Sequence, residues 1–150
     1  MIKIIAVGKI KEKYFSDAID EYLKRLSAYT KISIVQIQDE KDSVFSKEKE
    51  AENILKNIKD NEYVITLEIN GKSFSSKEFA SFIETRNVSG NSNLTFIIGG
   101  SLGLDESIIN KADYHLSFSN MTFPHQLMRV ILLEQIYRAF KIIKGEPYHK

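Results

Sequence analysis

Three short stretches of the chain combine residue types that bind small molecules. Residues 99–103, Gly-Gly-Ser-Leu-Gly, directly follow the apolar run LTFII at 94–98. Residues 117–123, SFSNMTF, interleave hydroxyl and amide groups with phenylalanine and methionine, and residues 147–150 read Pro-Tyr-His-Lys. Glycine lets a backbone approach a ligand closely, and aromatic or methionine side chains cover the face of a flat ligand. The later part of the chain therefore carries the candidate site.

The glycine stretch fits more than one class of site. It lacks the G-x-G-x-x-G spacing of a nicotinamide site, but it matches the G-x-S-x-G of a serine hydrolase, with Ser101 as nucleophile. In those hydrolases the serine leads straight into a helix, whereas Gly103 and the expected cap Asp105 delay the helix here by about one turn. The available bases are His115, His125 and His149. Spacing selects none of them, so the hydrolase stays an alternative.

Composition excludes several other classes. The chain has no cysteine and three histidines without an H-E-x-x-H pattern, so we expect no metal site. Its opening apolar run is too short for a signal peptide or a membrane span, which predicts a cytoplasmic protein with no membrane partner. The net charge is only +1, but residues 117–150 hold five Lys/Arg against two Glu, 5 − 2 = +3. The candidate site thus lies in the basic part, as a polyanionic partner requires.

Strand and helix patterns alternate along the chain. Apolar runs predict strands at 1–8, 31–38, 63–69, 94–98 and 115–119, and helical spacing predicts helices at 14–27, 46–58 and 124–144. Two further helices are expected, one opened by a capping box of Ser75 and Glu78 and one capped by Asp105. Asn70-Gly71 is typical of a turn and residues 39–45 of a polar loop. The alternation predicts a single α/β domain over residues 1–150 with a largely parallel sheet.

Such a sheet also predicts where a ligand binds. In open parallel sheets, ligands bind beyond the carboxyl ends of the strands. Three loops lie at such ends, after Leu67, Ile98 and Ser117. Because two of them are the glycine stretch and the hydroxyl-rich run, we expect these segments to meet at one site.

The helix expected at 124–144 has more apolar surface than one sheet needs. Pro124 fits its first turn and Gly145 its end. Its apolar residues cover roughly 200° of the circumference, against about 100° for an ordinary surface helix; they are Met128, Ile131, Leu132, Leu133, Ile136, Ala139, Phe140, Ile142 and Ile143. The surplus favours a homodimer, with a central helix of a monomer core as the alternative. Arg129 lies inside this arc and either meets a buried partner or reaches solvent along its stem.

The same segments resemble one known group of enzymes. The stretches FIIGGSLGL, LSFSNMTFPHQLMRVILLEQIYRAFKII and PYHK resemble the SPOUT class of methyltransferases. More narrowly, they resemble the small single-domain family that methylates N3 of a pseudouridine in 23S ribosomal RNA of the large subunit. The opening AVGKIKEKYF and the later VITLEINGK also fit, while residues 39–45 fit least.

The resemblance implies a C-terminal trefoil knot, which general rules of protein topology would not suggest. It implies S-adenosylmethionine as methyl donor, bound by Leu67, Gly99, Phe118, Ser119, Asn120, Met121, Thr122 and Phe123. It also implies that the tail of one subunit serves the site of its partner in a homodimer.

Substrate contact is then expected from Tyr148 and His149, with Arg138 as a cation and His125 as a second candidate. The expected partner is 23S ribosomal RNA in the assembled ribosome. A ribosome-binding dimer without enzymatic activity is the alternative.

Overall fold

The fold alternates strands and helices along the chain. The computed structural model describes residues 1–40 and 44–150, so the expected polar loop at 39–45 lies partly outside the described residues. The strands are β1 (Ile2–Val7), β2 (Ile32–Ile37), β3 (Tyr63–Ser73), β4 (Leu94–Ile98) and β5 (Tyr114–Ser117). The helices are α1 (Lys13–Leu26), α2 (Ser46–Leu55), α3 (Ser76–Val88), α4 (Glu106–Lys111) and α5 (His125–Ile143).

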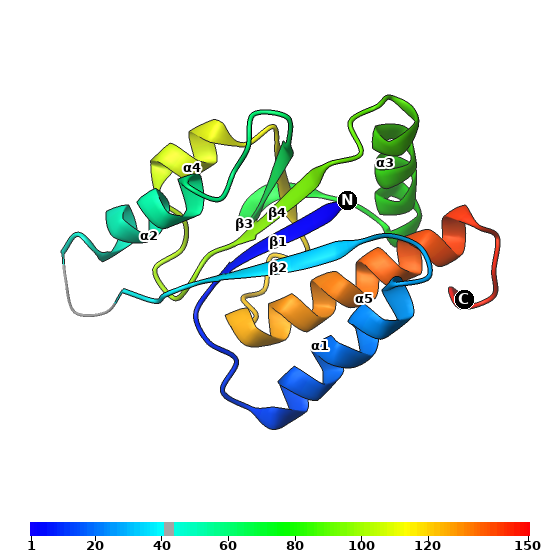
Figure 1. Ribbon diagram of the computed structural model, residues 1–150, viewed down its shortest axis with the longest axis horizontal. Helices are drawn as coiled ribbons and strands as arrows, with labels where there is room; N and C mark the ends of the chain where they lie inside the picture. Colours follow the sequence, from blue (N-terminus) through cyan, green and yellow to red (C-terminus); the bar gives the residue numbers. More distant parts are fainter. Residues whose placement is uncertain (41–43) are drawn as a thin grey trace.

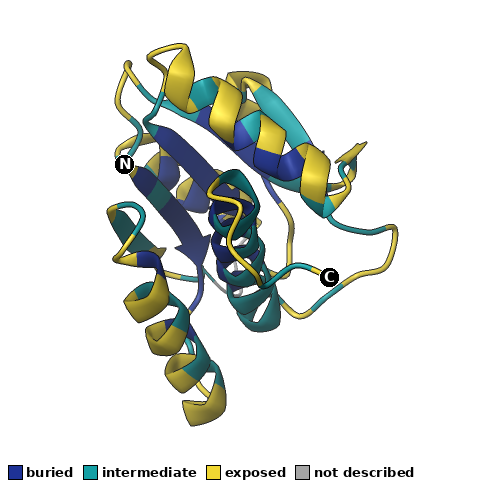
Figure 2. Cartoon of the chain, turned by 90° about the vertical axis from the view of Figure 1, so that its right-hand side faces the viewer, coloured by how far each residue is buried: buried dark blue, intermediate teal, exposed yellow. Residues whose placement is uncertain are grey.

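The five strands form one parallel sheet in the order β2-β1-β4-β3-β5 (Figure 1). Side chains alternate between its faces, as Ile4 and Ile5 of β1 show by belonging to different core clusters. Helices α1, α3 and α5 cover the larger core, and α2 and α4 cover the smaller one. The buried residues are concentrated in the strands, while the helices turn exposed residues outward (Figure 2). The predicted parallel α/β sheet is confirmed.

Two predicted helix starts are confirmed in atomic detail. Ser75 accepts a hydrogen bond from the backbone N–H of Glu78 at 3.1 Å, and the Glu78 carboxylate accepts one from the Ser75 N–H at 2.8 Å. Asp105 accepts a hydrogen bond from the Ser107 N–H at 3.0 Å. Each contact satisfies a backbone donor that the first turn of a helix leaves open.

Two other predictions were wrong. Asn70-Gly71 is not a turn that ends the strand, because β3 continues to Ser73 with a register shift between Leu67 and Lys72 against β5. A Cβ at Gly71 would lie 2.8 Å from the carbonyl oxygen of His115, so glycine is needed where the two backbones come close. Pro124 lies just before α5 as its N-cap rather than within its first turn.

Helix α5 is packed largely inside its own chain. Leu132, Leu133 and Ile136 are fully buried and Phe140 is 6 % exposed, so most of the apolar arc faces the sheet, α1 and α3. Ile131 remains partly exposed and lies outside the main core cluster. The apolar surface of α5 that is left for a partner chain is therefore narrower than the sequence suggests, because α1 and α3 cover two sides of the helix.

Candidate functional site

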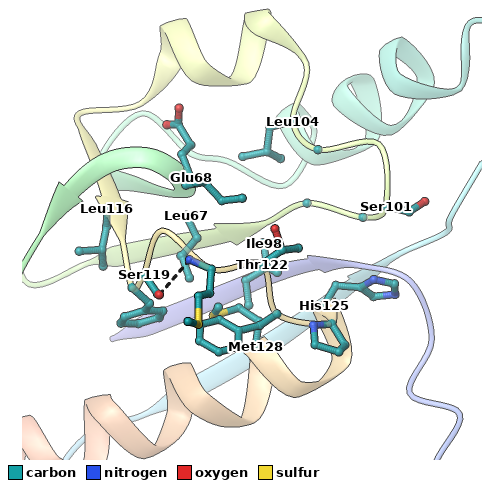
Figure 3. Close-up of a pocket in the computed structure, with 18 of the residues that line it drawn as sticks. Leu67, Glu68, Ile98, Ser101, Leu104, Leu116, Ser119, Thr122, His125 and Met128 are labelled. Carbon is teal, nitrogen blue, oxygen red and sulfur yellow. Dashed lines mark hydrogen bonds between the residues drawn. The ribbon is translucent and has the colours of Figure 1, made fainter.

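The carboxyl ends of β4, β3 and β5 lie side by side and enclose a pocket of about 720 Å³ with the start of α5 (Figure 3). Its size is within the range of about 300–1,000 Å³ that is usual for small-molecule sites. It is lined by Leu67, Glu68, Ile69, Ile98, Gly99, Gly100, Ser101, Gly103, Leu104, Ile109, Leu116, Phe118, Ser119, Met121, Thr122, Phe123, Pro124, His125 and Met128. The two stretches expected to meet at the strand ends do so.

The glycine stretch forms one wall of this pocket through a tight turn. The Gly103 N–H donates to the Gly100 carbonyl at 3.0 Å, and Gly103 has a φ of +76°. A Cβ at Gly99 would lie 3.0 Å from the carbonyl carbon of Gly103, and one at Gly100 would lie 3.0 Å from a methyl of Val7. The turn therefore folds back on itself closely, and side chains at 99 or 100 would displace it.

The second wall is the run after β5. Phe118, Ser119, Met121, Thr122 and Phe123 line the pocket, whereas the exposed Asn120 does not. Ser119 Oγ accepts a hydrogen bond from the Met121 N–H at 3.0 Å, drawn as a dashed line in Figure 3. The backbone N–H groups of Asn120, Thr122 and Phe123 have no hydrogen-bond partner within residues 1–40 and 44–150. The run thus offers polar backbone groups beside apolar side chains.

Sequence reasoning missed a polar cluster at the pocket rim. Glu68 hydrogen-bonds both the Thr66 hydroxyl and the His115 ring, and Thr66 Oγ1 lies 3.1 Å from His115 Nδ1. Thr66 and His115 are register partners on β3 and β5. The one sequence signal for this cluster was that its residues lie near the ends of two predicted strands, at 63–69 and 115–119. His115 entered the sequence analysis only as a hydrolase base, because the pairing of strands distant in sequence is not visible in a motif.

The first turn of α5 joins the pocket to the end of β1. His125 lines the pocket, and a Cβ at Gly8 would lie 3.3 Å from its Nε2. Arg129, one turn further, is 2 % exposed and donates from Nη2 to the Gly8 carbonyl at 3.1 Å. Burial lowers the pKa of the Arg129 guanidinium. Of the two alternatives for Arg129, the buried one is therefore correct, with a carbonyl as partner.

The tail residues gather at the other end of α5. Arg138 Nη1 lies 3.1 Å from His149 Nδ1, and its guanidinium is 4.9 Å from the centroid of the Tyr148 ring. Glu134 accepts hydrogen bonds from Arg138 Nε at 2.8 Å and from the Tyr148 hydroxyl at 3.4 Å. The hydrogen bond that Arg138 donates to Glu134 raises the pKa of Arg138. Burial, with a hydrogen bond to Tyr22, raises the pKa of Tyr148 to about 12.

The structure thus brings seven of the eight residues expected to bind a donor into one pocket, all except Asn120, but leaves the tail apart from it. None of Arg138, Tyr148 and His149 is among the pocket-lining residues, whereas His125 is. The tail instead packs on its own helix, with the Tyr148 ring 4.8 Å from that of Tyr137. Within one chain, the expected site is in two separate pieces.

The hydrolase alternative gains no support from this geometry. Ser101 is exposed, and α4 begins at Glu106 rather than directly after it. Across the described residues, no hydrogen bond joins Ser101 to a histidine. His115 instead contacts Glu68, and His149 contacts Arg138. No group of three or more metal-ligating side chains was found in residues 1–40 and 44–150. In the same described part, no helix is long and apolar enough to cross a membrane.

Comparison with known proteins agrees with the fold. Residues 1–149 match the family described as "Predicted SPOUT methyltransferase", and the chain belongs to this family. A solved structure, that of a probable methylase family protein from Haemophilus influenzae Rd KW20, superposes with a TM-score of 0.57 at 17 % identity. The superposition covers 99 % of this chain and 70 % of that one, and it shows a shared fold.

Closer relatives cover the whole chain. The chain is 60 % identical to a ribosomal RNA large subunit methyltransferase H from Clostridium botulinum (strain Alaska E43 / Type E3), over 99 % of both proteins. It is 58 % identical to the protein of that name from Alkaliphilus oremlandii (strain OhILAs), again over 99 % of both. The resemblance found in the sequence is confirmed.

Proposed function

We propose that this protein is an S-adenosylmethionine-dependent methyltransferase that modifies N3 of a pseudouridine in 23S ribosomal RNA of the assembled ribosome. The pocket at the ends of β3, β4 and β5 carries the proposal, because the glycine turn and the 118–123 run build it together. Membership of the SPOUT methyltransferase family and the names of the full-length relatives support it. They also count against a ribosome-binding dimer without activity.

The residues present fit the methyl donor. The N–H groups of Asn120, Thr122 and Phe123, which no other described residue pairs with, suit the polar edge of an adenine, while Phe118 and Met121 suit its flat face. Leu67, Gly99, Ser119 and Thr122 complete the cradle, since all four line the pocket. The exposed side chain of Asn120 does not line the pocket, so Asn120 would take part through its backbone N–H. When bound, the donor supplies an electrophilic methyl group on a sulfonium sulfur.

The protein's own chemical task is to orient the acceptor and manage its proton. N3 of a pseudouridine carries a proton that must pass to solvent before the nitrogen can attack, and a nearby cation or hydrogen-bond donor stabilises the resulting anion. Arg138 is such a cation. With a guanidinium donating to Nδ1, His149 keeps its proton on Nε2 and presents a donor. Tyr148, with its pKa raised to about 12, is likewise a donor rather than a base.

We propose that the complete site needs two chains. The tail cluster of Arg138, Tyr148 and His149 is fixed at the far end of the helix that begins at the pocket. An antiparallel pairing of α5 with its copy would bring the tail of each chain to the pocket of the other. The partly exposed Ile131, which borders a small pocket with Phe79 and Gln135, would supply apolar surface of α5 to this pairing. A symmetric dimer of this kind is the common arrangement of soluble oligomers.

We further propose that the C-terminal segment is threaded as a trefoil knot. The glycine turn and the 118–123 run both line one pocket although β5 and α4 separate them in sequence. The family assignment supports this topology. Small residues in both segments would let the chain pass closely, as the tight contact of Gly99 with Gly103 illustrates.

Mass spectrometry of ribosomal RNA tests the proposal directly. Large-subunit RNA from cells with and without the protein should differ by one methyl group on a pseudouridine. Purified protein should restore that group on ribosomes from the deficient cells when S-adenosylmethionine is added. Identical spectra from both strains would refute the proposed activity.

A further inference from the structure

Arg129 is a buried cation with an incomplete set of partners. It is 2 % exposed, and among the residues that the structure describes its Nε has no hydrogen-bond partner and its one hydrogen bond runs to the Gly8 carbonyl. Within the described chain, no carboxylate lies within ion-pair distance of it. Burying a guanidinium without a carboxylate is costly. The hydrogen bond from Arg129 to the Gly8 carbonyl therefore holds one segment in place despite the cost of burying the guanidinium.

That segment is the loop between β1 and α1, residues 8–12. Three contacts tie it to the first turn of α5. Arg129 holds the Gly8 carbonyl, the Gly8 backbone lies against the His125 ring, and the Lys11 N–H donates to Gln126 Oε1 at 2.9 Å. Because His125 lines the pocket, the loop is fixed directly beside the pocket wall.

The loop presents cations and an aromatic ring to solvent. Lys9 and Lys11 are exposed and have no ion-pair partner among the described residues, whereas Lys13 pairs with Asp17 at 2.8 Å. Tyr14, the next residue, is 65 % exposed. The side chain of Glu12 is the one acid between residues 9 and 14, and α1 has no acidic residue in its first turn. The surface beside the pocket is therefore cationic and carries an exposed aromatic ring, whose centroid lies 4.6 Å from that of Phe15.

We propose that residues 9–14 form a contact surface for RNA flanking the target nucleotide, with Lys9 and Lys11 on backbone phosphates and Tyr14 stacked on an unpaired base. This inference rests on the proposed function, because it assumes an RNA substrate at the adjacent pocket. Lysine ammonium groups bind phosphates as point charges, and exposed aromatic rings stack on splayed bases of single-stranded RNA. Fixing the loop to α5 keeps these contacts in register with the pocket.

The test compares two double variants of equal charge. Lys9→Gln/Lys11→Gln removes the proposed phosphate contacts, and Lys24→Gln/Lys31→Gln removes two exposed lysines elsewhere on the surface. Binding to ribosomes is measured by co-sedimentation across a range of salt concentrations. Each lost phosphate contact should lower the slope of log K against log salt by about 0.7, which is roughly 5-fold in affinity at 0.1 M salt. We expect about 25-fold weaker binding for the first variant, with donor affinity unchanged, and little change for the control.

Tyr14 gives an independent arm. Tyr14→Ala should weaken ribosome binding about 5-fold or more, while Tyr14→Phe should keep it, because stacking needs the ring and not the hydroxyl. With p-benzoylphenylalanine in place of Tyr14, ultraviolet light should yield an adduct with ribosomal RNA. An adduct only with a ribosomal protein, or equal salt slopes for both double variants, overturns the proposal. Since sedimentation needs no catalysis, wild-type protein that binds but does not methylate would count against the proposed function instead.

Discussion

Deleting residues 147–150 separates the two halves of the proposed site most cleanly. The deletion removes Tyr148 and His149, which pack on Arg138 and Tyr137 at the end of α5. It leaves the donor pocket untouched, because no residue after Met128 lines it. We expect donor binding to remain at the wild-type level and methylation of ribosomes to fall below detection.

Helix geometry decides which pocket the tail can serve. Met128, the last helical residue that lines the pocket, precedes the helix end at Ile143 by 15 residues, or about 22 Å at 1.5 Å per residue. Six residues lead from Ile143 to His149, and they span at most about 22 Å even when fully extended. The tail could therefore reach its own pocket only when fully extended, without its contacts to Tyr137 and Arg138. A second chain can supply the tail with those contacts kept, and we expect it to do so.

Mixing two inactive variants measures this directly. The truncated chain keeps its pocket, and a Gly99→Val chain keeps its tail while its glycine turn is displaced by contact with the Gly103 backbone. Random pairing of equal amounts gives half heterodimers, each with one complete site of two. The mixture should recover about 25 % of wild-type activity.

Two controls and one outcome make the experiment decisive. Sedimentation must show that both variants and their mixture are dimeric, and calorimetry must show that only the Gly99→Val chain has lost donor binding. If heterodimers form and the mixture stays as inactive as its parents, the tail does not act across the interface.

Three further outcomes are expected. Ile131→Asp should give a folded monomer by sedimentation and circular dichroism, whereas Ile136→Asp, in the chain's own core, should unfold the protein; a dimeric Ile131→Asp protein would place the interface elsewhere. Ser101→Ala should retain full methyltransferase activity, and a fluorophosphonate that labels wild-type Ser101 would contradict this. Lys3→Met should cost about 2 kcal/mol or more in urea unfolding at pH 7, because it leaves the buried Glu62 carboxylate without its ammonium partner. Burial raises the pKa of Glu62, but hydrogen bonds from Lys3 and Thr95 outweigh burial and lower this pKa overall. The loss of stability caused by Lys3→Met should therefore shrink as the pH falls below about 4.5.

Much of the fold was predictable because local patterns agree with the global arrangement. The apolar runs at β1 and β4 are buried on both faces of the sheet, and such strands read as continuous hydrophobic segments. Ser75, Glu78 and Asp105 act through contacts two or three residues away, so their roles are visible in sequence. Prediction failed at Asn70-Gly71, where the reason for the glycine is a neighbouring strand distant in sequence.

The site was predictable only in part, for the same reason. The composition of the glycine turn and of the 118–123 run was enough to predict that both belong to the site. The cluster of Thr66, Glu68 and His115 could not be predicted in this way, because it exists only through the pairing of β3 with β5. The apolar arc suggested that Ile136 lies at an interface between chains. In the structure Ile136 is buried in the core of its own chain. A helical pattern shows that a face is buried and does not show what buries it.

Under the proposed function, helix α5 links stability, assembly and activity in one element. Its first turn carries His125 at the pocket, its middle fills the core with Leu132, Leu133 and Ile136, and its end holds the tail through Arg138. Since pocket and tail lie at opposite ends of one helix, completing the site within a chain would require the tail to leave Tyr137 and Arg138 and to extend fully. Under the proposed dimer, every active site is then a product of association, and activity must follow the monomer–dimer equilibrium. Specific activity per chain should therefore decline on dilution below the dimer dissociation constant, while donor binding, a property of a single pocket, should not.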